Sequence, residues 1–319
     1  MILQHIYEQY GISCYYDRGE QGSLLRSGDW YLFPIPVSSF RERSIEVLAY
    51  ATKYLGDQGE KNIAQIVMTR NGESQSVYQG DSLVLLAVPV TLENIALTGD
   101  ALARFHQLTQ MEPTVYRKDR PYLNWSELWQ KRADQTLNWV MESLKSDSPP
   151  EFEQRLLEVY PYYAGRAENA IQYVVDLLID RPVEEGASLC LSRIHPSMWA
   201  GKEGYIKWPT EWVIDHPGRD LGEYLRAICW DGDRNEEDLR AFFTSYKRVR
   251  PISQVGASLA FARLLFPLPF FETVEGYYSG SWNEAASLQA LENCEGRSKK
   301  EEVLLTRFED LGLSPVYKV

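Results

Sequence analysis

The polar side chains best suited to chemistry lie in two stretches of the second half of the chain. Residues 189–198 carry Arg193 and His195, and a later stretch carries the carboxylates Asp215 and Asp220. Carboxylates accept protons and bind Mg²⁺, whereas an arginine guanidinium stays protonated and has no acceptor atom. These stretches therefore offer candidate metal ligands, but Arg193 cannot serve as a general base.

Other common catalytic motifs are missing from the sequence. It contains no GxSxG elbow, no GxxxxGK[ST] phosphate loop and no HExxH zinc motif. The four cysteines, Cys14, Cys190, Cys229 and Cys294, lie far apart and form no CxxC pair. This spacing is typical of reduced, buried thiols and predicts neither a zinc site nor a disulfide framework.

Charge and hydropathy limit the classes of partner. The chain has 319 residues, of which 45 are acidic and 33 basic, and its formal net charge is -12. An acidic surface repels nucleic acid and anionic lipid, so neither is expected as a partner. No run approaches the roughly 18 apolar residues that a membrane span requires, and no signal peptide is recognisable at the N-terminus. We therefore expect a soluble protein made in the cytoplasm, with no membrane span.

The two polar stretches have to be positioned by a chain whose character changes near residue 90. Between residues 12 and 90, short apolar strands alternate with glycine-bearing turns, and one amphipathic helix is expected over 40–55. The pattern predicts an α+β fold with a β-rich domain over 1–90 and a mostly helical domain over 91–319. Beyond residue 91 we expect strand-like pieces at 188–191 and 205–208, and helices over 100–110, 123–144, 152–178, 221–228, 236–245, 257–265 and near 304–311.

Aromatic residues gather in three places within the helical part, at 160–163, 266–271 and 277–278. Such clusters either pack in the core between helices or form an exposed surface for a partner. The sequence leaves both interpretations open.

Three segments carry a resemblance to a known family. Residues 102–106 are similar to an L-A-x-F-H helix, residues 189–198 to a catalytic loop that reads L-x-H-G-D-x-H-P-x-N, and residues 220–223 to a D-L-A signal. In these features the chain resembles the aminoglycoside-phosphotransferase-like kinases, and more narrowly the spore coat proteins of the CotS and YutH type. The resemblance implies a bilobal protein-kinase-like fold, with a small β-rich lobe and a large helical lobe.

The same resemblance implies that the catalytic loop is degenerate. The catalytic aspartate of active relatives falls on Arg193, and their metal-binding asparagine falls on Met198. An arginine cannot accept the proton of an attacking hydroxyl, and a thioether is a poor ligand for a hard cation such as Mg²⁺. By the same likeness, His195 is expected to brace the loop, and Asp220 to accept hydrogen bonds from it.

The second metal ligand of the family has two possible positions in this chain. If the strand end that reads I-D-W in active relatives is 206–208, the aspartate has become Lys207, and the distance to Asp220 favours this register. If the strand end is 213–215, Asp215 retains the ligand, and the stretch to Asp220 is unusually short. Neither register restores the lost base.

The phosphate-binding parts of the β-rich domain are degenerate as well. Residues 30–36 stand where active relatives carry the ATP-phosphate lysine, but they contain no lysine and two prolines, which argues for an irregular or edge strand. Residues 19–22 stand where a phosphate-covering loop would lie, and Glu20 would repel a triphosphate there. Glu46 is either the counterpart of the lysine's partner or a solvated residue of a helix face.

We therefore expect a catalytically inactive kinase-like protein without a cofactor. The resemblance implies a structural or docking component of the endospore coat, made in the mother-cell cytoplasm and partnered by other coat proteins. One alternative is an active phosphotransferase in which Asp215, Glu211 or another carboxylate takes over as base, and a second is a non-catalytic ligand-binding module. Unpaired cations at Arg193, Lys207 and Arg219 would suit an anionic ligand, whereas paired cations would indicate a structural remnant.

Overall fold

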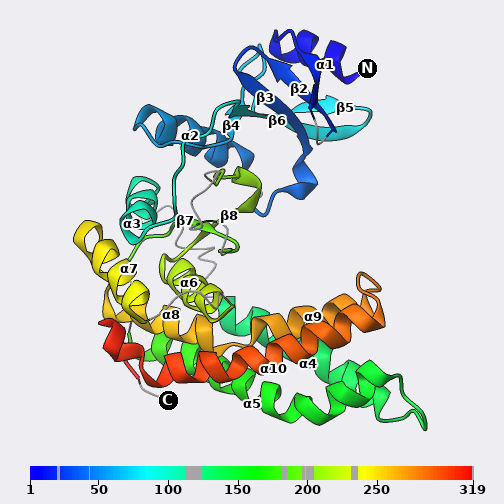
Figure 1. The fold of residues 1–319 in the computed structure, drawn as a ribbon, viewed down its shortest axis with the longest axis vertical. Coiled ribbons are helices and arrows are strands. Elements are labelled where there is room, and N and C mark those ends of the chain that lie inside the picture. Colours follow the sequence, from blue (N-terminus) through cyan, green and yellow to red (C-terminus); the bar gives the residue numbers. More distant parts are fainter. Residues whose placement is uncertain are drawn as a thin grey trace. The chain divides into compact units, whose positions relative to one another are not determined.

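The computed structural model describes residues 1–19, 22–42, 44–111, 124–181, 185–195, 198, 205–230 and 236–317. The chain, drawn in Figure 1, divides into two compact units. The first unit comprises Met1–Gln110 and Leu189–Ile214, and the second comprises Met111–Ser188 and Asp215–Val319. The first unit contains the β-rich part of the chain and the second is helical. Residues 91–110 and 189–214 belong to the first unit, and the domain boundary expected at residue 90 stays a prediction.

An antiparallel sheet forms the centre of the first unit. Its strands follow the order β1-β2-β3-β6-β4, and β5 also pairs with β6. The register places Leu32 opposite both Leu25 and Ala87, so that these side chains share one face of the sheet. The strands are β1 (Tyr15–Gly19), β2 (Gly22–Ser27), β3 (Trp30–Pro36), β4 (Gln65–Val67), β5 (Ser76–Tyr78) and β6 (Asp81–Pro89).

Strand β3 lies between two partners, although its prolines predicted an irregular or edge strand. It pairs with β6 along its whole length, from Trp30 to Pro36. Its pairing with β2 covers only Trp30–Leu32. Pro34 and Pro36 therefore lie outside the stretch of β3 that pairs with β2, where the missing N–H groups cost little.

Two helices pack against this sheet. Helix α1 (Ile2–Tyr10) buries Ile6 and Tyr10 in a core cluster with residues of β2, β3 and β6. Helix α2 (Ile45–Asp57) packs against β4, and its Thr52 hydroxyl accepts a hydrogen bond of 3.3 Å from the amide of Ile66. The expected helix over 40–55 is therefore present with a later start, whereas α1 was not predicted.

The remainder of the first unit leads into the candidate catalytic loop. Helix α3 (Gly99–Leu108) begins after Thr98, whose side chain accepts a hydrogen bond from the amide of Ala101. Strands β7 (Ser188–Leu191) and β8 (Trp212–Asp215) pair with each other, with the short helix η4 (Pro209–Glu211) before β8. The strand expected over 205–208 is reduced to one isolated bridge between Ile63 and Lys207.

Seven α-helices make up most of the described part of the second unit, and α6 packs against α8 while α4 packs against α5 (Figure 1). The helix expected near 304–311 corresponds to the end of α10 and to η5, whereas α9 and the rest of α10 were not predicted. Most of the buried side chains of α10 are small or polar, among them Ser287 and Ser298, so its sequence lacks an apolar stripe. The helices are α4 (Trp125–Ser143), α5 (Glu151–Asp180), α6 (Gly218–Trp230), α7 (Glu236–Val249), α8 (Gln254–Leu265), α9 (Leu268–Tyr278) and α10 (Glu284–Thr306), followed by η5 (Phe308–Leu311).

The aromatic residues of the second unit pack largely in its core. The ring of Phe266 stacks on those of Trp129 and Phe271, with centroid distances of 4.5 and 5.0 Å. Tyr163 stacks on Phe270 at 4.1 Å. These rings are buried, which favours packing over docking for this part of the aromatic residues.

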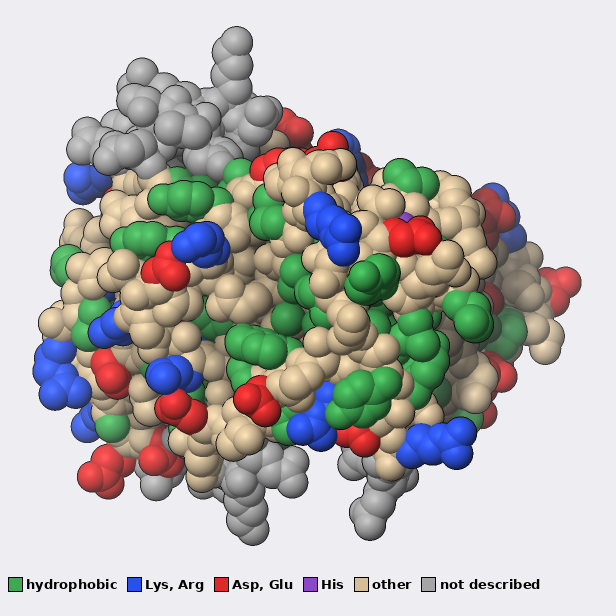
Figure 2. Space-filling view, turned by 90° about the horizontal axis from the view of Figure 1, so that it is seen from above, with side chains coloured by type: hydrophobic (Ala, Val, Ile, Leu, Met, Phe, Trp, Pro, Cys, Tyr) green, Lys and Arg blue, Asp and Glu red, His purple; other side chains and the backbone are tan. Residues whose placement is uncertain are grey.

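No single helix among the described residues is long and apolar enough to cross a membrane; α8 and α9 reach that length and hydropathy only as a bent pair. Figure 2 shows one face of the molecule, on which acidic and basic side chains are interspersed with hydrophobic ones.

Candidate functional site

The loop that follows β7 is held by hydrogen bonds to η4. The amide of Ser192 donates to the carbonyl of Glu211 at 2.7 Å, and the Ser192 hydroxyl donates to the Glu211 carboxylate at 2.8 Å. Arg193 is half-buried, and its guanidinium donates to the carbonyl of Ser192 at 3.1 Å. The position expected for a catalytic carboxylate thus carries a cation that contacts a backbone carbonyl.

Backbone hydrogen bonds place His195 and Met198, the other two residues of the loop for which a role was predicted. The amide of Met198 donates to the carbonyl of His195 at 3.0 Å, and the carbonyl of Met198 accepts from the amide of Leu97 at 2.7 Å. The side chain of His195 is exposed. The backbone hydrogen bond between His195 and Met198 is consistent with the predicted role of His195 in holding the loop, but that role stays a prediction.

Lys207 is buried beside a carboxylate that the sequence analysis did not identify. Its ammonium lies 2.7 Å from Glu60, and only 6% of its side chain is exposed. Glu60 also pairs with Arg104 at 2.7 Å. The backbone of Lys207 donates to the carbonyl of Asn62, which fixes this segment beside the residues that precede β4. Lys207 is therefore part of a buried ion pair and lies at an isolated bridge, not at a strand end.

Asp215 is the last residue of β8, and both of its carboxylate oxygens are engaged by protein donors. One oxygen accepts from the indole of Trp125 at 3.1 Å and from Arg219 at 3.2 Å. The other accepts from the amide of His216 at 2.7 Å. The side chain is 2% exposed, so a charged carboxylate at this depth needs these donors.

The short connection from Asp215 to Asp220 is stabilised by His216. The amide of Gly218 donates to Nδ1 of His216 at 2.9 Å, and Nε2 lies 2.8 Å from Glu185. Because Nδ1 accepts a hydrogen bond, the ring proton resides on Nε2 and is donated to the carboxylate. Burial alone would raise the pKa of Glu185, but the interaction with His216, a hydrogen bond from Ser253 and the charge of Arg250 together lower that pKa below its usual value.

Asp220 lies in the first turn of α6, completely buried, and its amide donates to the carbonyl of Pro217 at 3.1 Å. Helix α6 approaches α8 closely on this side. A Cβ atom on Gly218 would lie 2.7 Å from the carbonyl oxygen of Gly256, and one on Gly222 would lie 2.6 Å from Cβ of Arg263. Only glycine fits at these two positions, which fixes the helix that carries Asp220.

The β-rich unit offers no lysine to a nucleotide along β3. The ring of Phe33 packs edge-on against Trp208, with the ring centroids 5.2 Å apart. Glu46 is exposed on α2, as expected for a solvated helix face. Glu20, which was expected to repel a triphosphate, lies outside the described residues.

Sequence reasoning missed two of the residues that bond Asp215 and Lys207. Trp125 and Glu60 lie 90 and 147 positions from the partners that they bond, Asp215 and Lys207. No local pattern could have signalled such pairs. His216 could have been noticed, because it directly follows the aspartate in one of the two possible registers.

Two comparisons with known sequences identify the family of this chain. The family model of the spore coat putative kinase YutH matches residues 3–308. The endospore coat-associated protein YutH of Bacillus subtilis (strain 168) is 34% identical over 259 residues, which cover 80% of this chain and 76% of that protein.

Two solved structures are similar in fold at low sequence identity. An aminoglycoside phosphotransferase from Alicyclobacillus acidocaldarius superposes with a TM-score of 0.70 at 15% identity, covering 94% of this chain and 93% of that chain. A spectinomycin phosphotransferase in complex with ADP and spectinomycin gives a TM-score of 0.63 at 13% identity, covering 94% of this chain and 98% of that chain. These similarities confirm the expected α+β, protein-kinase-like fold of the aminoglycoside phosphotransferase type. The chain belongs to the YutH family of spore coat putative kinases.

Proposed function

We propose that this chain is a catalytically inactive member of its kinase-like family and serves as a structural or docking protein of the endospore coat. The observation that carries the proposal is the environment of Asp215, whose two oxygens accept hydrogen bonds from Trp125, Arg219 and the His216 amide. An arginine that pairs with this buried carboxylate supplies the positive charge that Mg²⁺ would otherwise supply.

We assign the metal-ligand position of active relatives to Asp215 rather than to Lys207. Asp215 ends a strand that pairs with β7, the strand that leads into the degenerate loop, whereas Lys207 belongs to no strand. This register leaves one of the family's carboxylates in place. It leaves Arg193 at the base position and Met198 at the other ligand position, and neither residue can perform the chemistry.

The pairing of the cations supports a structural remnant. Lys207 and Arg219 each contact a carboxylate, Glu60 and Asp215 respectively. The anionic ligand that unpaired cations would attract therefore has less to bind at these positions. The packing of Trp208 against Phe33 likewise occupies one face of the strand in which active relatives carry their phosphate-binding lysine.

The coat location rests on the relative that is described as endospore coat-associated. We extend it to this chain and infer synthesis in the mother-cell cytoplasm and assembly with other coat proteins. The acidic composition, with a net charge of -12, favours basic partners over nucleic acid.

A turnover assay tests the inactivity directly. The purified protein is incubated with labelled Mg·ATP, and both ADP release and transfer to protein or amino-alcohol acceptors are compared with those of Asp215→Asn. We expect equal, background rates for the two proteins. Turnover by the wild type that disappears in Asp215→Asn would establish an active phosphotransferase with rearranged carboxylates and contradict the proposal.

A further inference from the structure

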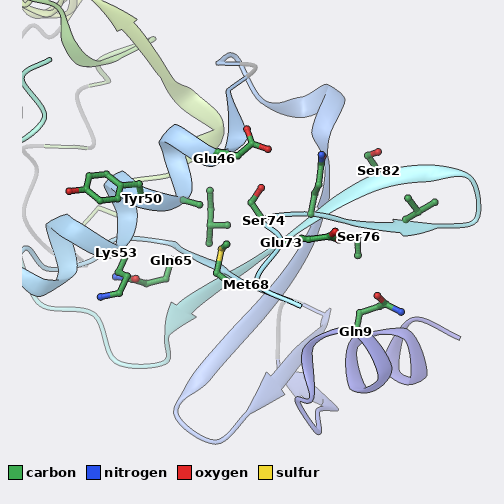
Figure 3. A pocket seen from close by; sticks show the side chains of 15 residues that line it. Gln9, Glu46, Tyr50, Lys53, Gln65, Met68, Glu73, Ser74, Ser76 and Ser82 are labelled. Atoms are coloured by element: carbon green, nitrogen blue, oxygen red, sulfur yellow. The ribbon is translucent and has the colours of Figure 1, made fainter. Parts of the chain in front are cut away.

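A groove in the first unit includes none of the candidate site residues discussed above except Glu46. It has a volume of about 1000 Å³ and lies between α2 and the segment that enters β5. Figure 3 shows its walls, and we call it the α2–β5 groove. Its lining includes Glu46, Tyr50, Met68, Glu73, Ser74 and Val77.

The floor of the groove holds a polar group without a partner. Ser74 is only 4% exposed, and its hydroxyl has no hydrogen-bond partner among the described residues. In Figure 3 this hydroxyl points toward α2, on the side of Glu46. A buried hydroxyl that lacks a partner is unfavourable, and a polar group of a ligand in the groove would satisfy it.

One wall of the groove is a strand edge. Strand β5 pairs only with β6 among the described strands, and Val77 lies opposite Ser82 in that hairpin. Gln79 and Gly80 have φ of 54° and 94°, as a two-residue hairpin turn requires, so Tyr78 and Asp81 form the hydrogen-bonded pair next to the turn. In the alternating pattern of such hairpins, the N–H and C=O of Val77 therefore point away from β6. They are available to an added extended segment.

The rim of the groove is apolar and acidic. Tyr50, Met68 and Val77 are 72%, 45% and 68% exposed. Glu46 and Glu73 are exposed, and neither has an ion-pair partner in the described part of the chain. The one lysine of the lining, Lys53, already lies 2.6 Å from Asp57 on its own helix.

We propose that the α2–β5 groove binds an extended segment of a partner protein in which lysine or arginine alternates with apolar residues. The segment adds to the edge of β5 through its backbone, a backbone polar group bonds the Ser74 hydroxyl, and its cations pair with Glu46 and Glu73. Its apolar side chains cover Tyr50, Met68 and Val77. This inference deepens the docking role proposed above and rests on it.

Selection from a displayed library of short random peptides tests the groove without knowledge of the partner. Full-length wild-type protein serves as bait, and Glu46→Lys/Glu73→Lys serves for counter-selection. We expect enriched peptides that alternate basic and apolar residues and bind the wild type at least about tenfold more tightly than the double variant. A selection that enriches no peptide able to distinguish the two proteins would overturn the proposal.

Calorimetry with the strongest selected peptide then tests individual residues. Ser74→Ala should weaken binding several-fold while leaving the melting temperature of the free protein unchanged or higher, because the unpartnered hydroxyl is removed. Glu127→Lys makes the same charge reversal as each single groove substitution, at an exposed position of α4, and should bind like the wild type. Unchanged binding by Ser74→Ala, or equal weakening by Glu127→Lys, would overturn the assignment to this groove.

Sedimentation measurements identify a different occupant. If the wild type is a dimer that Glu46→Lys/Glu73→Lys converts to a monomer, the occupant is a second copy of this chain, and a basic partner segment is wrong. The docking role itself is tested separately, because ATP turnover by the wild type would contradict it. None of these groove substitutions should affect that measurement. If no selected peptide distinguishes the wild type from the double variant and no ATP turnover is detected, the groove alone is therefore rejected.

Discussion

The pairing of Arg219 with Asp215 gives a quantitative prediction. At 3.2 Å the two charges attract by about 5 kcal/mol when the effective dielectric constant is about 20. Desolvation offsets part of this attraction, and Arg219, at 15% exposed, still reaches water. Asp215 also keeps the N–H groups of Trp125 and His216 in any Arg219 variant. We therefore expect Arg219→Met to lower the free energy of unfolding by about 2–3 kcal/mol.

A double-mutant cycle isolates the pair from other effects of substitution. Urea unfolding followed by circular dichroism is measured for the wild type, Arg219→Met, Asp215→Asn and the double variant. We expect a coupling energy of about 2 kcal/mol, because asparagine removes the charge of Asp215. Asparagine can accept at only one of the two oxygen positions, but this loss is common to both asparagine variants and therefore cancels in the cycle. A coupling below about 0.5 kcal/mol, or a more stable Arg219→Met protein, would refute the reasoning that Arg219 neutralises this carboxylate.

Three further predictions concern other ion pairs and one titrating group. Lys207→Met should lower the free energy of unfolding by about 1–3 kcal/mol. This is less than the loss expected when a fully buried pair is broken, because Glu60 still pairs with Arg104. Urea unfolding measures the loss, and an unchanged midpoint would contradict the prediction. Glu301→Gln should cost about 3–5 kcal/mol, because buried Arg166 loses its carboxylate at 3.0 Å and Arg226 loses the nearer of its two carboxylates, at 3.2 Å, and keeps Glu223 at 3.9 Å; a loss below about 1 kcal/mol would show that Glu223 and the neighbouring carbonyls suffice. Burial lowers the pKa of His5, which contacts Ser76 at 2.9 Å, below its ordinary value of 6.5, so the folded state disfavours the protonated ring. The contribution of His5 to stability is therefore complete above pH 6.5 and is lost as the pH falls through and below that value. In urea unfolding, the stability difference between wild type and His5→Asn should fall between pH 7.5 and 5.5. A difference that rises toward acid pH would contradict this sign.

Much of the fold follows from local sequence pattern. Alternating apolar residues and glycine turns predicted the hairpins of the sheet, and apolar periodicity predicted α3 to α8 to within a few residues at most boundaries. Helix α1 lies where no element was expected; only two of its side chains, Ile6 and Tyr10, are buried in the core of the first unit. Helix α10 buries serine, cysteine and glutamate, which only the surrounding helices make favourable.

For the candidate site, the sequence predicted lost chemistry, which stays a prediction, but not the partners that the structure shows. Arg193 and Met198 could be recognised as unsuitable for phosphoryl transfer from residue chemistry alone. The two registers for the metal-ligand position could not be separated from sequence, because strand pairing decides which residue ends β8. The partners of Lys207 and Asp215 come from distant parts of the chain, and tertiary packing alone brings them together.

The most direct test of the central claim is calorimetric titration of ATP into the full-length protein, with and without Mg²⁺. If Arg219 takes the place of a metal beside Asp215 and no base is present, millimolar ATP should give no Mg²⁺-dependent heat of binding and no Mg²⁺-dependent shift in melting temperature. Saturable binding that requires Mg²⁺ and is lost in Asp215→Asn would show that Asp215 still holds a metal, and would contradict the inactive, structural role proposed for this chain.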